Sequence, residues 1–123
     1  MALRIDITEE NDVIILKIIG KVDSFTHPEL NNSFDLVMKK GKKNILLIMR
    51  DMNYIDSIGI GSIIRFAKWV AKIGGTLKIA EMQSNIRQVF RLLSYDQILS
   101  IYDSASEAIM SFREDYHPND QSI

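Results

Sequence analysis

The sequence contains no cysteine among its 123 residues. This absence excludes disulfide bonds, thiolate nucleophiles and thiolate metal sites together. A secreted domain of this size often carries disulfide bonds, so their absence favours the reducing cytoplasm as the location of the protein. We therefore expect a cytoplasmic protein that folds around a hydrophobic core without covalent cross-links.

The sequence also lacks an excess of one charge and a long apolar segment. Fifteen Lys and Arg residues stand against 16 Asp and Glu residues, whereas binding to a nucleic-acid backbone usually needs a basic excess. The longest apolar runs, residues 13–16 and 45–49, are far shorter than the roughly 20 residues of a membrane-spanning helix. The N-terminus has neither the basic flank nor the apolar stretch of a signal peptide. We expect no direct binding to nucleic acid and no insertion into a membrane.

The composition is that of one folded domain. Hydrophobic residues make up 46% of the chain and charged residues 25%, which is close to the average for soluble globular proteins. No linker, repeat or low-complexity segment interrupts residues 1–115, so we assign them to a single domain. Residues 116–123 are polar, contain a proline and show no periodicity, which predicts a flexible C-terminal tail.

The spacing of apolar residues predicts strands that alternate with helices. The expected strands are short apolar or alternating runs at residues 3–7, 13–19, 45–49, 77–80 and 98–101. Residues 50–57 are polar and irregular, which predicts a loop. Because parallel strands need crossover connections, this alternation predicts an α/β domain with a mainly parallel central β-sheet and about four helices packed on it.

The expected helices begin close to residues that commonly cap helices. Thr26 with Glu29, and Ser104 with Glu107, have the spacing of capping boxes. Ser84 is expected to cap the third helix. The second helix is expected from about residue 57 to residue 73, with its apolar residues repeating every three or four positions.

The segment around Ser57 is the strongest candidate for a functional site. It lies where a strand ends and a helix begins, and free backbone N–H groups and the helix dipole favour an anion there. A phosphate on Ser57 would be stabilised at this position. A simpler interpretation fits the same residues, since Ser57 could be only an N-cap and the nearby glycines could only allow a tight turn.

Enzyme motifs fit this segment poorly. A nucleophile elbow needs glycine two residues before the serine, and that residue is Ile55. The two histidines are His27 and His117, neither of which is close to Ser57 in sequence. A dinucleotide fingerprint would need glycine where Ile64 stands, and the sequence has no phosphate-binding GKS or GKT loop.

Metal binding would need acidic side chains that converge. Asp23, Asp51 and Asp56 could supply carboxylate oxygens only if folding brought them together. Solvated surface or capping carboxylates are the usual explanation of such residues, so we expect no metal site and no cofactor.

At these residues the sequence resembles a STAS domain. The most specific part is the Asp-Ser-x-Gly-x-Gly motif at residues 56–61. Segments outside this motif also resemble family elements, in the same order along the chain: residues 20–23, 45–49, 74–79, 86–90 and 101–108. The resemblance therefore covers nearly the whole chain.

The resemblance implies an anti-sigma factor antagonist. In that family the unphosphorylated protein binds a serine kinase that is also an anti-sigma factor, and this frees the sigma factor. The kinase phosphorylates the serine of the motif, and a PP2C-type phosphatase removes the phosphate. Ser57 matches this serine, Asp23 and Asp56 match acidic residues near it, and Gly59 and Gly61 match glycines of the turn.

Two residues depart from the family pattern. Arg50 stands where an acidic or small polar residue is common, and Ile58 stands where many members have a second serine. The first departure bears on partner choice, and the second leaves no hydroxyl next to Ser57. The resemblance predicts a switch site and partner-binding surface that comprises Asp23, Ser24, Thr26, Asp56, Ile58, Gly59 and Gly61.

We therefore interpret the chain as a phosphorylation-controlled binding module and not an enzyme, with the second helix and the loop before it as the partner face. A phosphate would add about −1.5 to −2 charges beside Asp56 and would repel the partner without refolding the domain. Two alternatives remain: a STAS subunit of a transporter or stress-sensing assembly that is never phosphorylated, and a weak serine hydrolase that uses Ser57. The oligomeric state is also left open.

Several aromatic residues are secondary candidates for the partner surface. Phe25, His27 and Tyr54 flank the expected switch loops. Trp69 lies between the apolar rows of the second expected helix, so we expect it to be partly buried. Exposed aromatic residues are enriched at protein contacts. A hydrophobic staple before the Thr26 cap would explain Phe25 as well.

Overall fold

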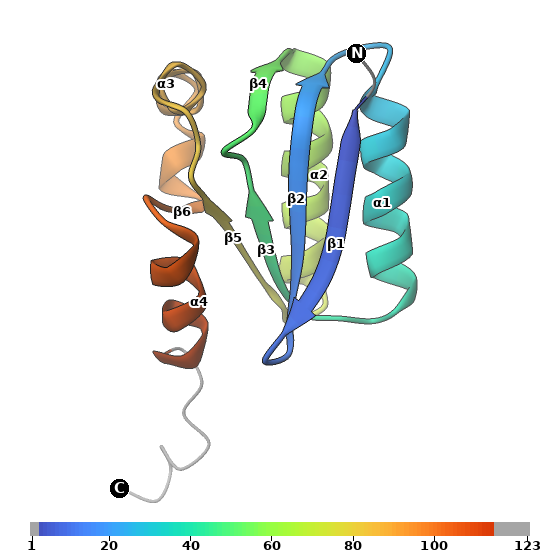
Figure 1. The fold of residues 1–123 in the computed structure, drawn as a ribbon, viewed down its shortest axis with the longest axis vertical. Coiled ribbons are helices and arrows are strands. Elements are labelled where there is room, and N and C mark those ends of the chain that lie inside the picture. Colours follow the sequence, from blue (N-terminus) through green and yellow to red (C-terminus); the bar gives the residue numbers. More distant parts are fainter. Residues whose placement is uncertain (1–2, 115–123) are drawn as a thin grey trace, which may run out of the picture.

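The computed structural model describes residues 3–114, which fold into one mixed β-sheet with helices on both faces (Figure 1). The elements follow in the order β1 (Arg4–Glu10), β2 (Val13–Val22), α1 (His27–Lys39), β3 (Asn44–Ile48), β4 (Met52–Ile55), α2 (Ser57–Lys72), β5 (Thr76–Ala80), α3 (Ser84–Leu92), the 3₁₀ turn η1 (Tyr95–Gln97), β6 (Ser100–Tyr102) and α4 (Ala105–Glu114). The tail that the sequence predicts at residues 116–123 lies outside the described residues.

The sheet is mainly parallel, as the alternation of strands and helices predicts. Its strand order is β1-β2-β3-β5-β6, and β4 pairs with β2 outside this path. Only β1 and β2 pair in antiparallel fashion among the described strands. The α/β class, the parallel sheet and the four α-helices are therefore confirmed.

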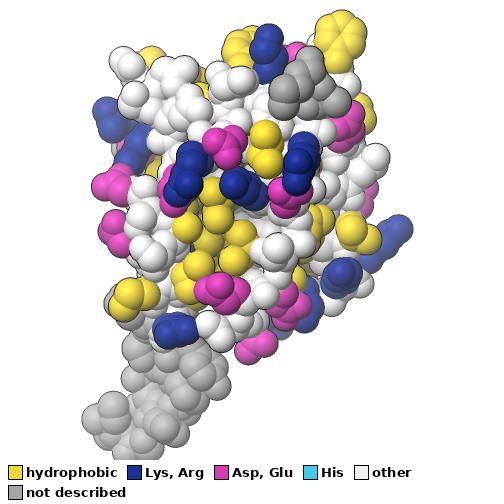
Figure 2. All heavy atoms as spheres, in the orientation of Figure 1, with side chains coloured by type: hydrophobic (Ala, Val, Ile, Leu, Met, Phe, Trp, Pro, Cys, Tyr) yellow, Lys and Arg dark blue, Asp and Glu magenta, His cyan; other side chains and the backbone are white. Residues whose placement is uncertain are grey.

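The central strands are continuously apolar because both faces of the sheet are covered. Alternate residues of β2 enter different cores: Ile14, Leu16 and Ile18 pack with α1 and α2, whereas Val13 and Ile15 pack with α4. α4 contacts β3, β5 and β6. Figure 2 shows hydrophobic side chains in the middle of the face that carries α4, with Lys and Arg side chains beside them. No helix within residues 3–114 is long and apolar enough to cross a bilayer.

A bulge in β2 changes its pairing partner. Residues 14–17 of β2 pair with β3, and residues 20–22 pair with β4, with a register shift between Gly20 and Lys21. Gly20 has φ of 112°, a conformation that glycine adopts without the steric penalty of a side chain. The bulge therefore lets one strand serve two neighbours, and this arrangement positions the loops described below.

The structure corrects the expected loop at residues 50–57 and the bounds of the last strand. Met52–Ile55 forms strand β4, of which only Met52 and Ile55 are buried, so the segment is too short for a clear alternating pattern. The last strand, expected at residues 98–101, is Ser100–Tyr102. Residues 95–97 form a 3₁₀ turn, and the Tyr95 carbonyl accepts from the backbone N–H groups of Ile98 and Leu99. These bonds keep residues 98 and 99 out of the strand.

The three expected helix caps have different outcomes. Thr26 occupies the N-cap position of α1 as expected, but its side chain makes no capping hydrogen bond. The expected cap of α3 is wrong, because Gln83 occupies the N-cap position and Ser84 is already inside the helix. In contrast, the Glu107 N–H donates to Ser104 Oγ over 3.1 Å at the start of α4. The Thr26 hydroxyl has other partners, which belong to the candidate site.

Candidate functional site

Two loops meet at the carboxyl ends of neighbouring parallel strands. β2 ends at Val22 and β4 ends at Ile55, and these two residues are paired in register. The Asp56 N–H donates to the Val22 carbonyl over 3.1 Å. The start of α1, which follows β2, and the start of α2, which follows β4, therefore lie at the same edge of the sheet (Figure 1). This pairing brings the predicted residues Asp23 and Ser57 into one region.

Asp56 and not Ser57 caps α2. The backbone of Asp56 is extended, its Oδ1 accepts from the Gly59 N–H over 2.9 Å, and its carbonyl accepts from the Ile60 N–H. Ser57 is the first helical residue and is exposed. No hydrogen bond among residues 3–114 uses the Ser57 hydroxyl or the backbone N–H groups of Ser57 and Ile58. The interpretation of Ser57 as an N-cap is therefore wrong, and its hydroxyl is available.

The two glycines of the motif have different environments. Gly59 is buried, and a Cβ atom on it would lie 2.5 Å from Val22 Cγ1 and 2.7 Å from Ile55 Cγ1. Glycine at this position therefore allows α2 to start tightly against both strands. Gly61 lies in the helix and has no atom within 4 Å of the place of a Cβ. The expectation that Gly61 belongs to the turn is wrong, and nothing in the structure requires glycine there.

Asp23 organises the loop between β2 and α1. Its Oδ1 accepts from the backbone N–H groups of Phe25 and Thr26 at 2.9 and 3.0 Å. The Thr26 hydroxyl donates to the Lys21 carbonyl over 2.7 Å and accepts from the Asp23 N–H over 3.0 Å. The Thr26 hydroxyl is therefore occupied with the loop, which explains why it makes no capping hydrogen bond to α1. Ser24 is exposed in the same loop.

The Asp23 carboxyl is in its charged form at neutral pH. Loss of solvent raises its pKa, but the hydrogen bonds from Phe25 and Thr26 and the charge of Lys21 outweigh that effect. The net result is a pKa below the ordinary value. Asp23 therefore brings a negative charge to the site, in addition to shaping its loop.

Apolar side chains are exposed around these loops. Phe25 is 88% exposed, Tyr54 48% and Ile58 46%. Ile58 directly follows Ser57, and Tyr54 lies on β4 opposite Lys21 of β2. Exposed apolar side chains mark a contact surface where they form a contiguous patch, and these three residues lie in or next to the two loops that meet at this edge. We call Phe25, Tyr54 and Ile58, together with Ser57, the switch face.

The described residues give no support for a metal site. No group of three or more His, Asp or Glu residues that could hold a metal ion occurs within residues 3–114. Asp51 lies 3.5 Å from the Lys17 ammonium, and the Asp56 and Asp23 carboxylates accept from backbone N–H groups. No hydrogen bond in the described chain joins His27 to Ser57, the contact that activates a serine nucleophile.

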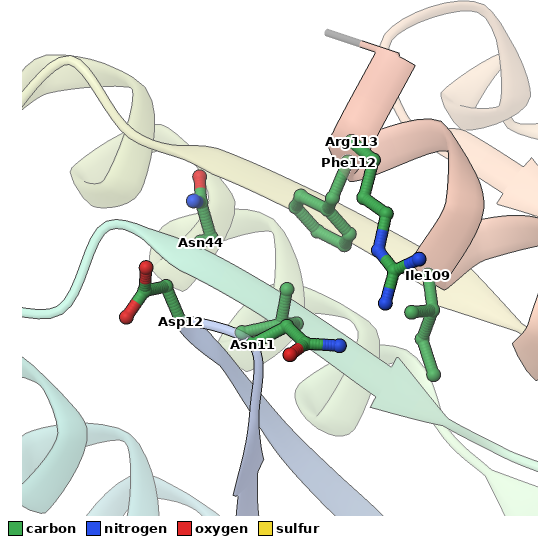
Figure 3. A pocket seen from close by; sticks show the side chains of 7 residues that line it. Asn11, Asp12, Asn44, Ile109, Phe112 and Arg113 are labelled. Carbon is green, nitrogen blue, oxygen red and sulfur yellow. The ribbon is translucent and has the colours of Figure 1, made fainter. Parts of the chain in front are cut away.

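One pocket of the described chain lies away from this site. It has a volume of about 330 Å³ and is lined by residues that include Asn11, Asp12, Asn44 and Phe112 (Figure 3). These residues lie at the amino ends of β2 and β3 and in α4, whereas Ser57 follows the carboxyl end of β4. The exposed residues Phe25, Tyr54, Ser57 and Ile58 do not line this pocket.

Comparison with known proteins identifies the family. Residues 4–108 match the model of the STAS domain. A Thermotoga maritima protein provisionally named an anti-sigma factor antagonist is 32% identical over 80 residues, which cover 65% of this chain and 71% of that protein. The anti-sigma-B factor antagonist of Bacillus subtilis is 25% identical over 101 residues, 82% of this chain and 92% of the relative.

A solved structure agrees with these sequence matches. The crystal structure of a Thermotoga maritima protein, also provisionally named an anti-sigma factor antagonist, superposes with a TM-score of 0.85 and 27% identity. The match covers 89% of this chain and 94% of that one. The fold and the sequence agree over nearly the same residues. The chain belongs to the STAS domain family, and the relatives described above are named as anti-sigma factor antagonists.

Proposed function

We propose that this protein is an anti-sigma factor antagonist controlled by phosphorylation of Ser57. The observation that carries the proposal is the exposed and unused Ser57 hydroxyl at the first position of α2. A phosphate on this oxygen would lie beside the unused N–H groups of Ser57 and Ile58, at the positive end of the helix dipole. The names of the relatives support the same general function.

Other hydroxyl groups near the site are poorer phosphate acceptors. The Thr26 hydroxyl is held by Lys21 and Asp23, and its phosphorylation would break both bonds. Ser62 is fully buried. Ser24 is exposed but lies in the loop before α1, outside the first turn of that helix. Ser57 combines exposure with a helix start, so it is the preferred acceptor.

The proposed partner of the unphosphorylated form is a serine kinase that also acts as an anti-sigma factor. The switch face offers it Phe25, Tyr54 and Ile58, and aromatic residues are enriched where proteins bind one another. Asp23, Thr26, Asp56 and Gly59 hold the two loops in place, and the exposed Ser24 extends the switch face. Binding would sequester the kinase and free its sigma factor.

Phosphorylation would end this binding through charge. The kinase transfers the γ-phosphoryl group of ATP to Ser57 Oγ and releases ADP, and a PP2C-type phosphatase later hydrolyses the phosphoserine to serine and phosphate. The phosphate adds about −1.5 to −2 charges to an apolar face. Asp56 is fixed as the cap of α2, so its carboxylate cannot move away. A partner that covers the face would have to desolvate both groups.

Phosphate mapping tests this proposal. The protein is incubated with ATP and an extract of its source cells, and the modified residue is located by mass spectrometry. We expect phosphate on Ser57, its loss in Ser57→Ala, and unchanged labelling in Ser106→Ala. Ser106 is a matched control because it is an exposed serine in the first turn of α4.

Two results would contradict the proposal. Labelling of Ser57→Ala at the wild-type level, on Ser24 or Thr26, would show that another hydroxyl is the acceptor. The absence of any labelling would favour a STAS subunit of a transporter or stress-sensing assembly that is never phosphorylated.

A further inference from the structure

A second pocket lies in the groove between α1 and α2. Its volume is about 260 Å³, and its lining comes entirely from these two helices. No residue of the switch face takes part in it. An engineered apolar cavity of about 150 Å³ is enough to bind benzene, so this pocket has room for one aromatic ring with a short polar substituent.

The floor of the pocket is a row of nearly parallel aromatic rings. Phe34 of α1 and Phe66 of α2 stack with ring centroids 4.0 Å apart and an angle of 6° between their planes. Phe66 and Trp69 continue the row at 6.4 Å, again with an angle of 6°. Phe34 and Phe66 are buried, whereas Trp69 is only partly buried and lines the pocket. The pocket therefore offers an aromatic surface to a further ring.

Two opposite charges line the same pocket, one from each helix. Asp35 belongs to α1 and Arg65 to α2, and both are exposed. No ion pair within residues 3–114 uses either side chain. The Arg65 guanidinium donates to the buried Ser62 hydroxyl over a long distance of 3.5 Å, and its other N–H groups stay available. Asp35 and Arg65 therefore do not pair with each other, and both charged groups can bind a ligand.

We propose that this pocket binds a small aromatic molecule that carries both an ammonium and a carboxylate group, of which phenylalanine is the simplest example. The ring packs against Trp69, the partly buried end of the aromatic row, while the ammonium group faces Asp35 and the carboxylate faces Arg65. The opposite charges of the two helices favour a zwitterion over an amine or an acid alone. The site is separate from the switch face, so the proposal does not depend on phosphorylation of Ser57.

Tryptophan fluorescence gives a direct assay, because Trp69 is the single tryptophan of the chain. Titration with phenylalanine, excited where only tryptophan absorbs, should change the emission of the full-length protein in a saturable way. Cyclohexylalanine, which keeps the charges and loses the aromatic ring, should bind about two- to tenfold more weakly. Phenethylamine and phenylpropionate, which each keep only one charge, should also bind more weakly than phenylalanine.

Variants with matched controls test the charged residues by calorimetry. Asp35→Asn and Arg65→Gln should each weaken phenylalanine binding about two- to fivefold, as expected for exposed charge pairs. Glu29→Gln on α1 and Lys68→Gln on α2 remove exposed charges of the same sign that do not line the pocket, and should leave binding unchanged. All four sites are exposed, so the variants should fold.

Three results would overturn the proposal. The first is the absence of saturation up to about 10 mM phenylalanine, which is ten times a Kd of about 1 mM. The second is equal binding of cyclohexylalanine and phenylalanine, which would show that the aromatic row has no role. The third is a loss of affinity in the two control variants as large as in Asp35→Asn and Arg65→Gln.

Discussion

Replacement of Gly59 and of Gly61 by alanine should change the stability of the protein in opposite directions. Both residues lie in α2, two positions apart, and the chemical change is the same. A methyl group on Gly59 would meet Val22 Cγ1 at 2.5 Å and Ile55 Cγ1 at 2.7 Å. A methyl group on Gly61 would meet no atom within 4 Å.

The magnitudes follow from two opposing effects. Alanine is favoured over glycine inside a helix by up to about 1 kcal/mol. Overpacking of a core costs about 1–3 kcal/mol, and Val22 is fully buried while Ile55 is only 9% exposed, so neither side chain can swing into solvent. Gly59→Ala should therefore lower the free energy of unfolding by about 1 kcal/mol. Gly61→Ala should raise it by about 0.5–1 kcal/mol.

Urea unfolding, followed by the fluorescence of Trp69, measures both changes. The double variant Val22→Ala/Gly59→Ala gives a further check, because Val22→Ala removes the nearest atom. It should be more stable than the sum of the two single changes predicts, since contacting residues couple by about 0.5–3 kcal/mol. A Gly59→Ala variant as stable as Gly61→Ala would refute the reasoning that tight packing requires Gly59.

Three further predictions concern charge and the proposed switch. Ser57→Asp should weaken binding to the cognate kinase at least tenfold, about 1.4 kcal/mol, in titration calorimetry, whereas Ser106→Asp should not; equal affinities would remove the electrostatic mechanism. The stability that Asp23 contributes should be present above the ordinary aspartate pKa of about 3.9 and be lost as pH falls through its lower folded-state value, because a carboxyl with a depressed pKa stabilises the fold only while it is charged. The free energies of unfolding of wild type and Asp23→Asn should therefore converge at low pH. A difference between them that stays constant across this pH range would contradict the prediction. Amide chemical shifts of the phosphorylated protein should change around residues 23–26 and 56–60 only, and changes spread through β2 and β5 would mean that the switch is conformational.

The second helix and the central strands could be predicted because their core contacts repeat along the sequence. Ile60, Ile63, Ile64 and Val70 recur at helical spacing, and all of them are buried. The long apolar runs of β2 and β3 have no alternation because both faces of the sheet are covered. In these elements the apolar pattern of the sequence and the tertiary packing favour the same secondary structure.

The details of the site could be predicted less well because distant residues decide them. β4 exists through its pairing with β2, and its two buried residues are too few to show a period. Thr26 and Glu29 have the spacing of a capping box, yet the Thr26 hydroxyl forms hydrogen bonds with the backbone of Lys21 and Asp23 instead. Asp56 is of a type that caps helices, so the sequence did contain a signal for the cap of α2. Phe66, which stacks on Phe34 of another helix, has no local signal for that contact.

The packing of α2 favours a switch that acts at its surface and not by refolding. Ile60, Ile63, Ile64, Phe66 and Val70 hold the helix in the core, each less than 9% exposed, and removing even one from contact costs about 1.5–3 kcal/mol. A phosphate at the first position of α2 gains about 0.3–1 kcal/mol from the helix dipole. Its repulsion from the Asp56 carboxylate opposes this gain, and water and salt screen that repulsion because Ser57 is exposed. Both local terms are smaller than the cost of moving the helix, so the added charge changes what can bind to the switch face and leaves the backbone beneath it in place.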